Sequence, residues 1–168
     1  MKILRPSLQG VVLGVVVLLS SCATEPKPGI VVLVENAPTP VQSVKVANDH
    51  LLKLMDAVGA KAPQINSATE LGAVIVRLGD AFQACDIAYK RLMTIDTVTA
   101  ADDKYLKEFF SRTPTKAGRE MGKVLLHKAE KYAGDGVLST QAQQALYWVG
   151  EWENTVQKLS RKPFKVQK

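Results

Sequence analysis

From Ser43 onward, apolar residues recur at intervals of three and four positions, the spacing that places them on one face of an α-helix. The first segment with this spacing runs from Ser43 to Val58, and Gly59 and Pro63 end it. Its apolar positions are Val44, Ala47, Leu51, Leu54, Met55 and Val58. The pattern predicts an amphipathic helix with one buried face.

The second helical segment is expected to be the longest. Ser67 and Glu70 have the spacing of a capping box, in which each side chain accepts a hydrogen bond from a backbone N–H of the other residue. Apolar residues then alternate at four and three positions: Leu71, Ile75, Leu78, Phe82, Cys85, Tyr89 and Leu92. Val76 and Ile87 lie on the opposite side. A helix that is apolar on two sides is expected in the middle of a bundle.

Two further helices are expected before residue 134. Thr99 and Asp102 mark the start of the first, and Thr113 followed by Pro114 marks its end, because a residue before proline is pushed out of the helical region. Its apolar residues are Tyr105, Leu106, Phe109 and Phe110. The next helix is expected over residues 115–133, with inward positions at Ala117, Met121, Val124, Leu125 and Tyr132.

The segment Gly134-Asp135-Gly136 predicts a helix stop and a turn. A fifth helix is expected to begin at Thr140, with Gln143 completing a second capping-box pattern. Its broad apolar face consists of Ala145, Leu146, Trp148, Val149, Trp152, Val156 and Leu159. Residues 43–160 therefore predict a mainly all-α domain of four or five helices packed as a bundle.

A compact apolar run, residues 30–34, precedes the helices. Four of its five residues are β-branched, which favours a strand buried on both faces. No second strand-like segment follows, and an isolated strand leaves its backbone groups unpaired. The run either lies extended in a groove of its own bundle or offers Ile30, Val32 and Val34 to the sheet edge of a partner. We expect it to dock on its own bundle, against Trp148 and Trp152, because exposing so many aliphatic side chains is unfavourable.

The first residues have the order of a secretory signal. Lys2 and Arg5 form a cationic start, and an apolar run over residues 11–19 follows. This run is too short for a membrane-spanning helix, which needs about 20 apolar residues. It ends in Leu19-Ser20-Ser21-Cys22, which resembles the lipobox of bacterial lipoproteins.

The resemblance implies cleavage before Cys22, a diacylglyceryl thioether on its sulfur and an acylated amino group, such as palmitoyl. Because Ala and not Asp follows at position 23, it also implies transfer to the outer membrane. On this interpretation residues 1–21 are a signal peptide, residues 22–42 are a lipidated tether with the extended apolar segment, and the protein is anchored at the periplasmic face.

Charge and cysteine usage fit an exported protein. Without residues 1–21, the chain has 20 basic and 16 acidic residues, a formal net charge of +4. This modest charge and export both argue against a nucleic-acid partner. Cys85 is the only cysteine besides Cys22, so no disulfide forms within the mature chain. We expect Cys85 in the core, with an intermolecular bridge as the alternative.

No motif of catalysis or metal binding is present. His50 and His127 are far apart, and neither belongs to a metal-ligand spacing. We therefore expect no catalytic residue, no metal and no cofactor other than the lipid on Cys22. Scattered carboxylates that meet in space would be needed for an enzyme, which leaves a cell-envelope enzyme with a composite site as an alternative.

Two basic features are candidates for binding. Lys116, Arg119, Lys123, His127 and Lys131 share one helical face, although Glu120 and Glu130 interrupt it and a solvated surface is the plainer interpretation. Residues 161–168 are expected to form a loose basic tail. Within it, Lys162 and Lys165 are suited to anionic lipid head groups or an acidic partner.

These features together favour a non-enzymatic interaction or assembly module at the outer membrane, with an envelope protein as its partner. The alternative is a helical protein that binds a small molecule or a lipid between its helices. A deep apolar cavity with converging polar groups would favour the alternative, and an apolar surface groove would favour the interaction module.

Overall fold

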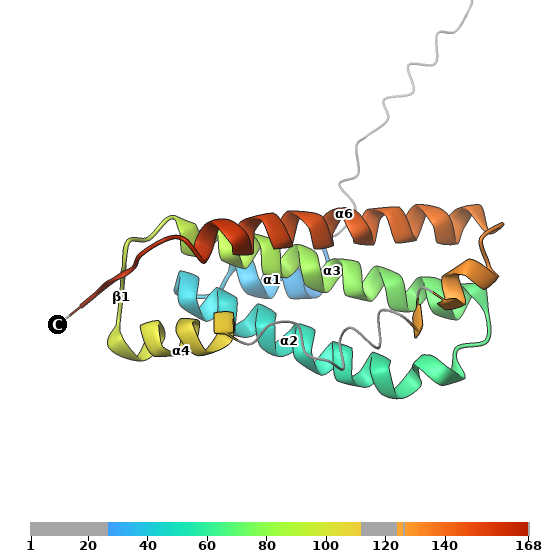
Figure 1. Ribbon diagram of the computed structural model, residues 1–168, viewed down its shortest axis with the longest axis horizontal. Coiled ribbons are helices and arrows are strands. Elements are labelled where there is room, and N and C mark those ends of the chain that lie inside the picture. Colours follow the sequence, from blue (N-terminus) through green and yellow to red (C-terminus); the bar gives the residue numbers. More distant parts are fainter. Residues whose placement is uncertain (1–26, 112–123, 126, 168) are drawn as a thin grey trace, which may run out of the picture.

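The computed structural model describes residues 27–111, 124–125 and 127–167. Three long helices, α2 (Pro40–Lys61), α3 (Ala68–Met93) and α6 (Gly136–Leu159), lie side by side with α3 in the middle (Figure 1). The most extensive packing joins α3 to α6, and the next joins α2 to α3. The all-α architecture is confirmed, and the helix expected in the middle of the bundle lies there.

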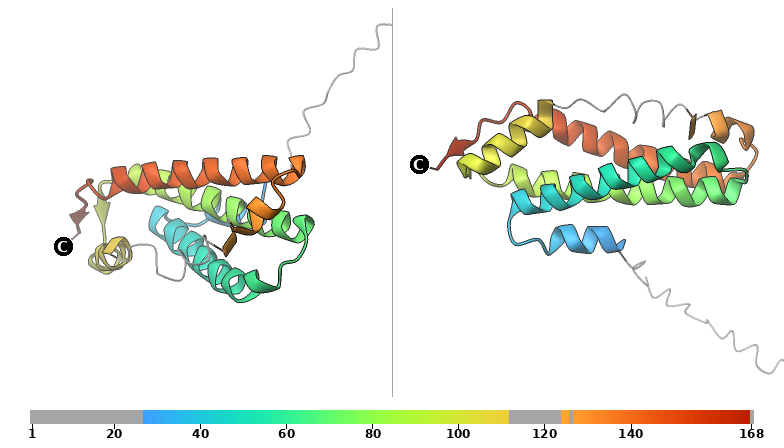
Figure 2. Two further views of the ribbon diagram at one scale, coloured as in Figure 1. Left: turned by 45° about the vertical axis from the view of Figure 1, so that its right-hand side comes forward. Right: turned by 90° about the horizontal axis from the view of Figure 1, so that it is seen from below.

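The remaining described elements are short. They are helix α1 (Gly29–Glu35), the 3₁₀ turn η1 (Ala62–Gln64), strand β1 (Thr97–Val98), helix α4 (Ala100–Ser111) and strand β2 (Lys165–Val166). Seen from below, α1 forms the outermost layer on one side of the molecule and α4 lies on the opposite side (Figure 2). Among the helices of the described ranges, none is both long and apolar enough to span a bilayer.

One hydrophobic core joins these helices. It contains the apolar positions that the helical spacing predicted for α2 and α3, including Leu51, Leu71, Cys85, Tyr89 and Leu92. Of the apolar face predicted for the last helix, only Trp152, Val156 and Leu159 belong to it or pack against it. Cys85 is fully buried, as expected. Its burial, followed by the neighbouring Asp86 carboxylate, raises the pKa of the thiol far above its ordinary value.

The predicted helix starts at Ser67 and Thr99 are confirmed. The Ser67 hydroxyl accepts a hydrogen bond from the Glu70 N–H at 3.2 Å, and the Glu70 carboxylate accepts one from the Asn66 N–H at 3.0 Å. Thr99 Oγ1 accepts from the Asp102 N–H at 3.1 Å. These caps could be predicted because the donor and acceptor are only three or four residues apart.

Helix α2 begins three residues earlier than Ser43. Thr39 caps it by accepting a hydrogen bond from the Gln42 N–H at 3.1 Å, and Pro40 occupies the first turn. Proline is favourable there because that N–H has no partner within a helix and the fixed φ suits helical geometry.

The prediction of an extended or strand-like segment at residues 30–34 is wrong, because this run lies in helix α1. A helix satisfies most of its backbone groups internally, whereas a lone strand cannot. The expected docking on the protein's own bundle is confirmed, since Val31 and Val34 are buried in the core. The expected location is wrong, because α1 packs on α2 and α3 and not on the Trp148 and Trp152 face of α6.

The predicted start of the last helix at Thr140 is also wrong. Helix α6 begins at Gly136, and the Asp135 carboxylate caps it by accepting a hydrogen bond from the Leu138 N–H at 3.0 Å. Thr140 lies inside the helix, where its hydroxyl donates to the Gly136 carbonyl oxygen. The longer helix brings Leu138 into the core.

Residues 161–167 do not form a loose tail. β2 pairs in parallel with β1, and the Lys165 N–H donates to the Asp96 carbonyl oxygen at 2.8 Å. The Lys162 ammonium donates to the Met93 carbonyl oxygen at 2.6 Å and pairs with the Asp96 carboxylate at 2.9 Å. The segment is therefore fastened to the end of α3 and the loop that follows it.

Candidate interaction surface

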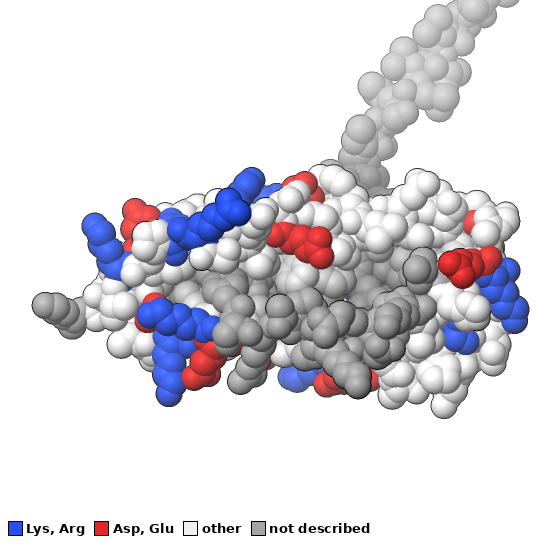
Figure 3. Space-filling view, viewed as in Figure 1, with Lys and Arg blue, Asp and Glu red and all other residues white. Residues whose placement is uncertain are grey.

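The first fifteen residues of α6, Gly136–Gly150, contain no charged residue. We call this part of the helix the uncharged half of α6. In Figure 3 it forms a white area along the upper edge of the molecule. The exposed side of α2 differs, because charged residues such as Asp49, Lys53 and Asp56 occupy it. The exposed polar residues of the uncharged half, Ser139, Thr140, Gln143 and Gln144, carry no charge. Since a surface helix ordinarily has charged residues on its outer face, this half is unusual in lacking them.

Large apolar side chains lie on the outer side of this half. Val137, Leu146 and Tyr147 are 70%, 68% and 59% exposed. The Tyr147 ring packs edge-on against Trp148, with ring centroids 5.0 Å apart. Interface centres are enriched in aromatic residues and depleted in charge, and this surface has both properties.

The exposure of Leu146 corrects the predicted inward face. A Cβ added at Gly79 would lie 3.2 Å from Ala145 Cα, so α3 and α6 touch almost backbone to backbone at this point. Because consecutive helical residues point about 100° apart, fixing Ala145 against α3 turns Leu146 outward. Sequence spacing alone made the apolar face of this helix too broad.

A buried hydrogen bond and a partly exposed ion pair hold α6 against α3. Asp86 is buried, and its carboxylate accepts a hydrogen bond from the Thr155 hydroxyl at 2.7 Å. The other carboxylate oxygen lies 2.7 Å from the Lys90 ammonium, which also lies 3.2 Å from Glu151. The hydrogen bond to Asp86 is the main cause that raises the pKa of Lys90. Sequence reasoning missed Asp86 and Thr155, because nothing local marks a polar residue that finds its partner on another helix.

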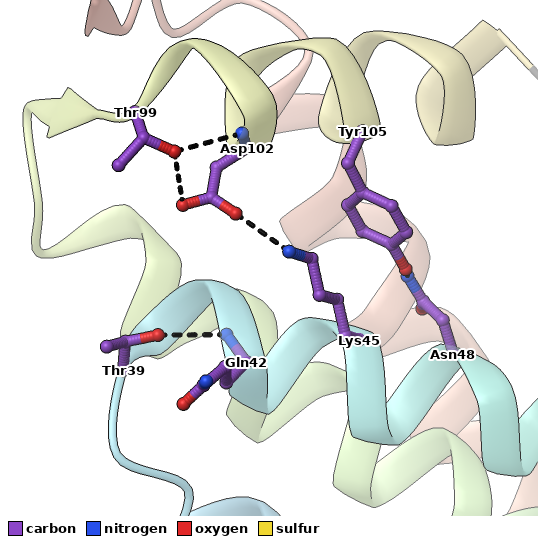
Figure 4. Close-up of polar contacts among 7 residues, drawn as sticks. All are labelled: Thr39, Gln42, Lys45, Asn48, Thr99, Asp102 and Tyr105. Atoms are coloured by element: carbon purple, nitrogen blue, oxygen red, sulfur yellow. Dashed lines mark hydrogen bonds and ion pairs between the residues drawn. The ribbon is translucent and has the colours of Figure 1, made fainter. Parts of the chain in front are cut away.

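A second buried polar group joins α2, α3 and α4. The Tyr89 hydroxyl donates to the Asn48 side-chain oxygen at 2.9 Å, and the Asn48 amide donates to the Tyr105 hydroxyl at 3.3 Å. Figure 4 shows Asn48 and Tyr105 facing each other, next to the Lys45 ammonium, which lies 2.8 Å from Asp102. Burial is the main cause that raises the pKa of Tyr89. These contacts are those of a rigid framework and hold α4 against α2.

A depression of about 410 Å³ lies beside the uncharged half of α6. Lys27, Asp80, Gln83, Gln141, Gln144 and Trp148 are among the residues that line it. Within the described ranges, the side chains of Asp80 and the three glutamines form no hydrogen bond or ion pair. Partial burial raises the pKa of Asp80. The depression therefore has spare donors and acceptors for a polar ligand.

The structure separates the candidate binding residues named from the sequence. Ile30 and Val34 face the core from α1, whereas Val32 is partly exposed on its outer side. Lys162 is held by Asp96 and Met93, and Lys165 is exposed beside it.

Only His127 and Lys131 of the predicted basic helical face lie within the described residues. His127 and Lys131 line a shallow depression together with Lys128. Several predicted features lie outside the described residues: Cys22, Lys116, Arg119, Lys123 and the helix end at Thr113-Pro114.

In the described part of the chain, no cluster of three His, Cys, Asp or Glu side chains is arranged to hold a metal ion. In comparisons with models of protein families, with curated proteins and with solved structures, the chain has no match. Function is therefore inferred from the chemistry of the surface.

Proposed function

We propose that the protein is a lipid-anchored, non-enzymatic interaction module at the periplasmic face of the outer membrane, and that it binds an envelope protein through the uncharged half of α6. The lipobox-like segment ending at Cys22 supports the anchor. The exposed Leu146 and Tyr147 support the partner.

The observation behind this proposal is the combination of rigidity and apolarity in α6. Its inner side is held by the Asp86–Thr155 hydrogen bond and by the close contact of Ala145 with Gly79. Its outer side therefore presents Leu146 and Tyr147 at fixed positions. Burying a large apolar side chain contributes about 1.5–3 kcal/mol, and aromatic residues dominate the energetic centres of interfaces.

The test is site-specific photo-cross-linking in intact cells. A photoreactive amino acid at position 147 should give one discrete adduct, and the same amino acid at Leu52, a 42% exposed apolar residue of α2, should not. The double variant L146D/Y147D, probed from position 143, should lose the adduct, and the control L52D should keep it. Both changes are at exposed positions, where stability changes by about 0.5 kcal/mol or less.

The proposal is wrong if position 147 gives no adduct above that at position 52. It is equally wrong if the purified partner binds L146D/Y147D as tightly as it binds the wild-type protein.

A second candidate function is binding of a small polar ligand in the depression beside α6, because Asp80 and three glutamine amides have no partner within the described ranges. A cationic ligand with several hydrogen-bonding groups would fit these side chains and the Trp148 ring. A ligand that raises the melting temperature of the wild-type protein and not of Asp80→Asn would support this candidate. No such shift across a panel of amines, amino sugars and short peptides would count against it.

A further inference from the structure

Helix α1 is apolar on two sides. Val31 and Val34 face the core and are fully buried. Val32 and Leu33 face outward and are 41% and 63% exposed. The only charged residue of α1, Glu35, pairs with Lys27 at 2.7 Å. The outer face of α1, which we define as Val32 and Leu33, therefore presents aliphatic side chains next to a neutralised ion pair.

The contacts of Arg91 prevent α1 from turning this face inward. The Arg91 guanidinium donates to the carbonyl oxygens of Val34, Glu35 and Ala37 and to the Ser43 hydroxyl. The Ser43 hydroxyl in turn donates to the Val34 carbonyl oxygen at 2.9 Å. A cation at the C-terminal end of a helix also interacts favourably with the helix dipole. The outer face is therefore a stable feature of the fold.

The position of α1 along the chain points to what covers this face. Lys27 is five residues after Cys22. A fully extended chain of five residues spans at most about 18 Å, so a lipid on Cys22 brings the bilayer surface within that distance of Lys27. α1 begins two residues later and is the outermost layer on its side of the bundle (Figure 2).

We propose that the outer face of α1 lies on the lipid bilayer, with Val32 and Leu33 entering the boundary between head groups and acyl chains. This inference depends on the anchor at Cys22 that the proposed function includes. The acyl chains provide the attachment, and α1 sets the orientation of the bundle. α6 forms the upper edge of the molecule in Figure 1 whereas α1 lies behind α3, so the two outer faces point in different directions, although Lys27 also lines the depression beside α6.

The experiment uses the full-length lipidated protein in vesicles of phosphatidylethanolamine and phosphatidylglycerol. A single cysteine replaces Leu33 and is labelled with an environment-sensitive fluorophore under native conditions. The matched controls are Leu52→Cys on α2 and Leu146→Cys on α6, both at exposed apolar positions. The wild-type protein measures background, because its remaining thiol, Cys85, is buried.

The label at position 33 should emit at shorter wavelength in vesicles than in the acyl-free protein, and lipids with a shallow nitroxide should quench it. The labels at positions 52 and 146 should show neither effect. Mass spectrometry of Cys22 and flotation with the vesicles first establish that the protein is acylated and membrane-bound. In such a sample, equal emission and equal quenching at positions 33 and 52 would overturn the inference.

Two other outcomes identify the source of a failure. Absence of acylation and of flotation would overturn the anchor, and with it this inference. A cross-link from position 33 to an envelope protein, without lipid quenching, would replace the bilayer by a protein as the occupant of this face.

Discussion

Arg91 shows how much of this fold depends on single side chains. It donates hydrogen bonds to three carbonyl oxygens in or just after α1 and to Ser43, which lie 48 to 57 residues away in sequence. The contacts form only once α1, α2 and α3 are assembled. Arg91 therefore joins three helices at one point.

Arg91→Met should lower the free energy of unfolding by about 2 kcal/mol, because it removes charge-assisted hydrogen bonds from partly buried acceptors. The matched control is Arg77→Met on the same helix, where the arginine is exposed and the change should be about 0.5 kcal/mol or less. Urea unfolding of the acyl-free protein measures both variants. Equal losses of stability in Arg91→Met and Arg77→Met would show that the hydrogen bonds from Arg91 to α1 contribute nothing to the free energy of unfolding.

Cys85 is the second residue whose environment makes a clear prediction. Its burial and the adjacent Asp86 carboxylate raise the pKa of the thiol, so the folded protein holds almost no thiolate at pH 8. A maleimide should react slowly with the folded acyl-free protein and quickly after denaturation in urea. Rapid labelling of the folded protein, or a disulfide-linked dimer in cell extracts, would contradict the core position.

At the scale of elements, α1 gives a direct test of helix against strand. In a helix Val31 and Val34 share one face, whereas in a strand Val32 and Val34 do. Val31→Ala and Val34→Ala should each lower stability by about 1–2 kcal/mol through lost burial and the cavity that remains, and the control Val32→Ala by about 0.5 kcal/mol or less. Melting temperatures of the three variants decide the matter. Similar losses for Val32 and Val34, with Val31 neutral, would favour the strand.

The contact between α3 and α6 predicts opposite effects for two glycines of α3. A methyl group at Gly72 would meet only the flexible end of Gln141, whereas one at Gly79 would press on the backbone of Ala145. Gly72→Ala should be neutral or stabilising by up to about 1 kcal/mol, because alanine favours helix. Gly79→Ala should destabilise by about 1–3 kcal/mol through overpacking. The midpoints of denaturant unfolding measure which of the two variants is less stable. A Gly79→Ala variant as stable as Gly72→Ala would show that α6 shifts to make room for the added methyl group.

At the scale of the whole molecule, α1 and α6 each present exposed apolar side chains, and we propose a different occupant for each of these two surfaces. α1 begins seven residues after Cys22, the proposed site of the anchor, and the outer side of α6 presents Leu146 and Tyr147 without a neighbouring charge on its own half of the helix. If both proposals hold, one small bundle would contact a membrane and a protein at the same time.

Cys22→Ala tests the membrane attachment on which this arrangement depends. The variant should take up no labelled fatty acid and should accumulate as an unprocessed precursor, because the thioether acceptor is gone. Metabolic labelling followed by mass measurement of the purified protein distinguishes the two forms. If the wild-type protein also takes up no fatty acid in a host with the pathway, the proposed location is wrong.

Local patterns in the sequence were sufficient for much of the architecture. The alternation from Leu71 to Leu92 predicted the central helix and the burial of Cys85, because helical period follows from backbone geometry alone. The caps at Ser67 and Thr99 were predictable because donor and acceptor are close in sequence. The apolarity of residues 30–34 likewise indicated that this run is buried against its own bundle.

Only the tertiary structure decided the features that involve distant residues. The β-branched composition of residues 30–34 favoured a strand, but packing on α2 and α3 with capping by Arg91 selected a helix. The contact at Gly79 set the rotation of α6 and turned Leu146 outward. β1 and β2 are two-residue strands 68 positions apart in their register, too short to leave a pattern. In each case the deciding contact joins residues far apart in the chain, and their separation leaves no signal in either local sequence.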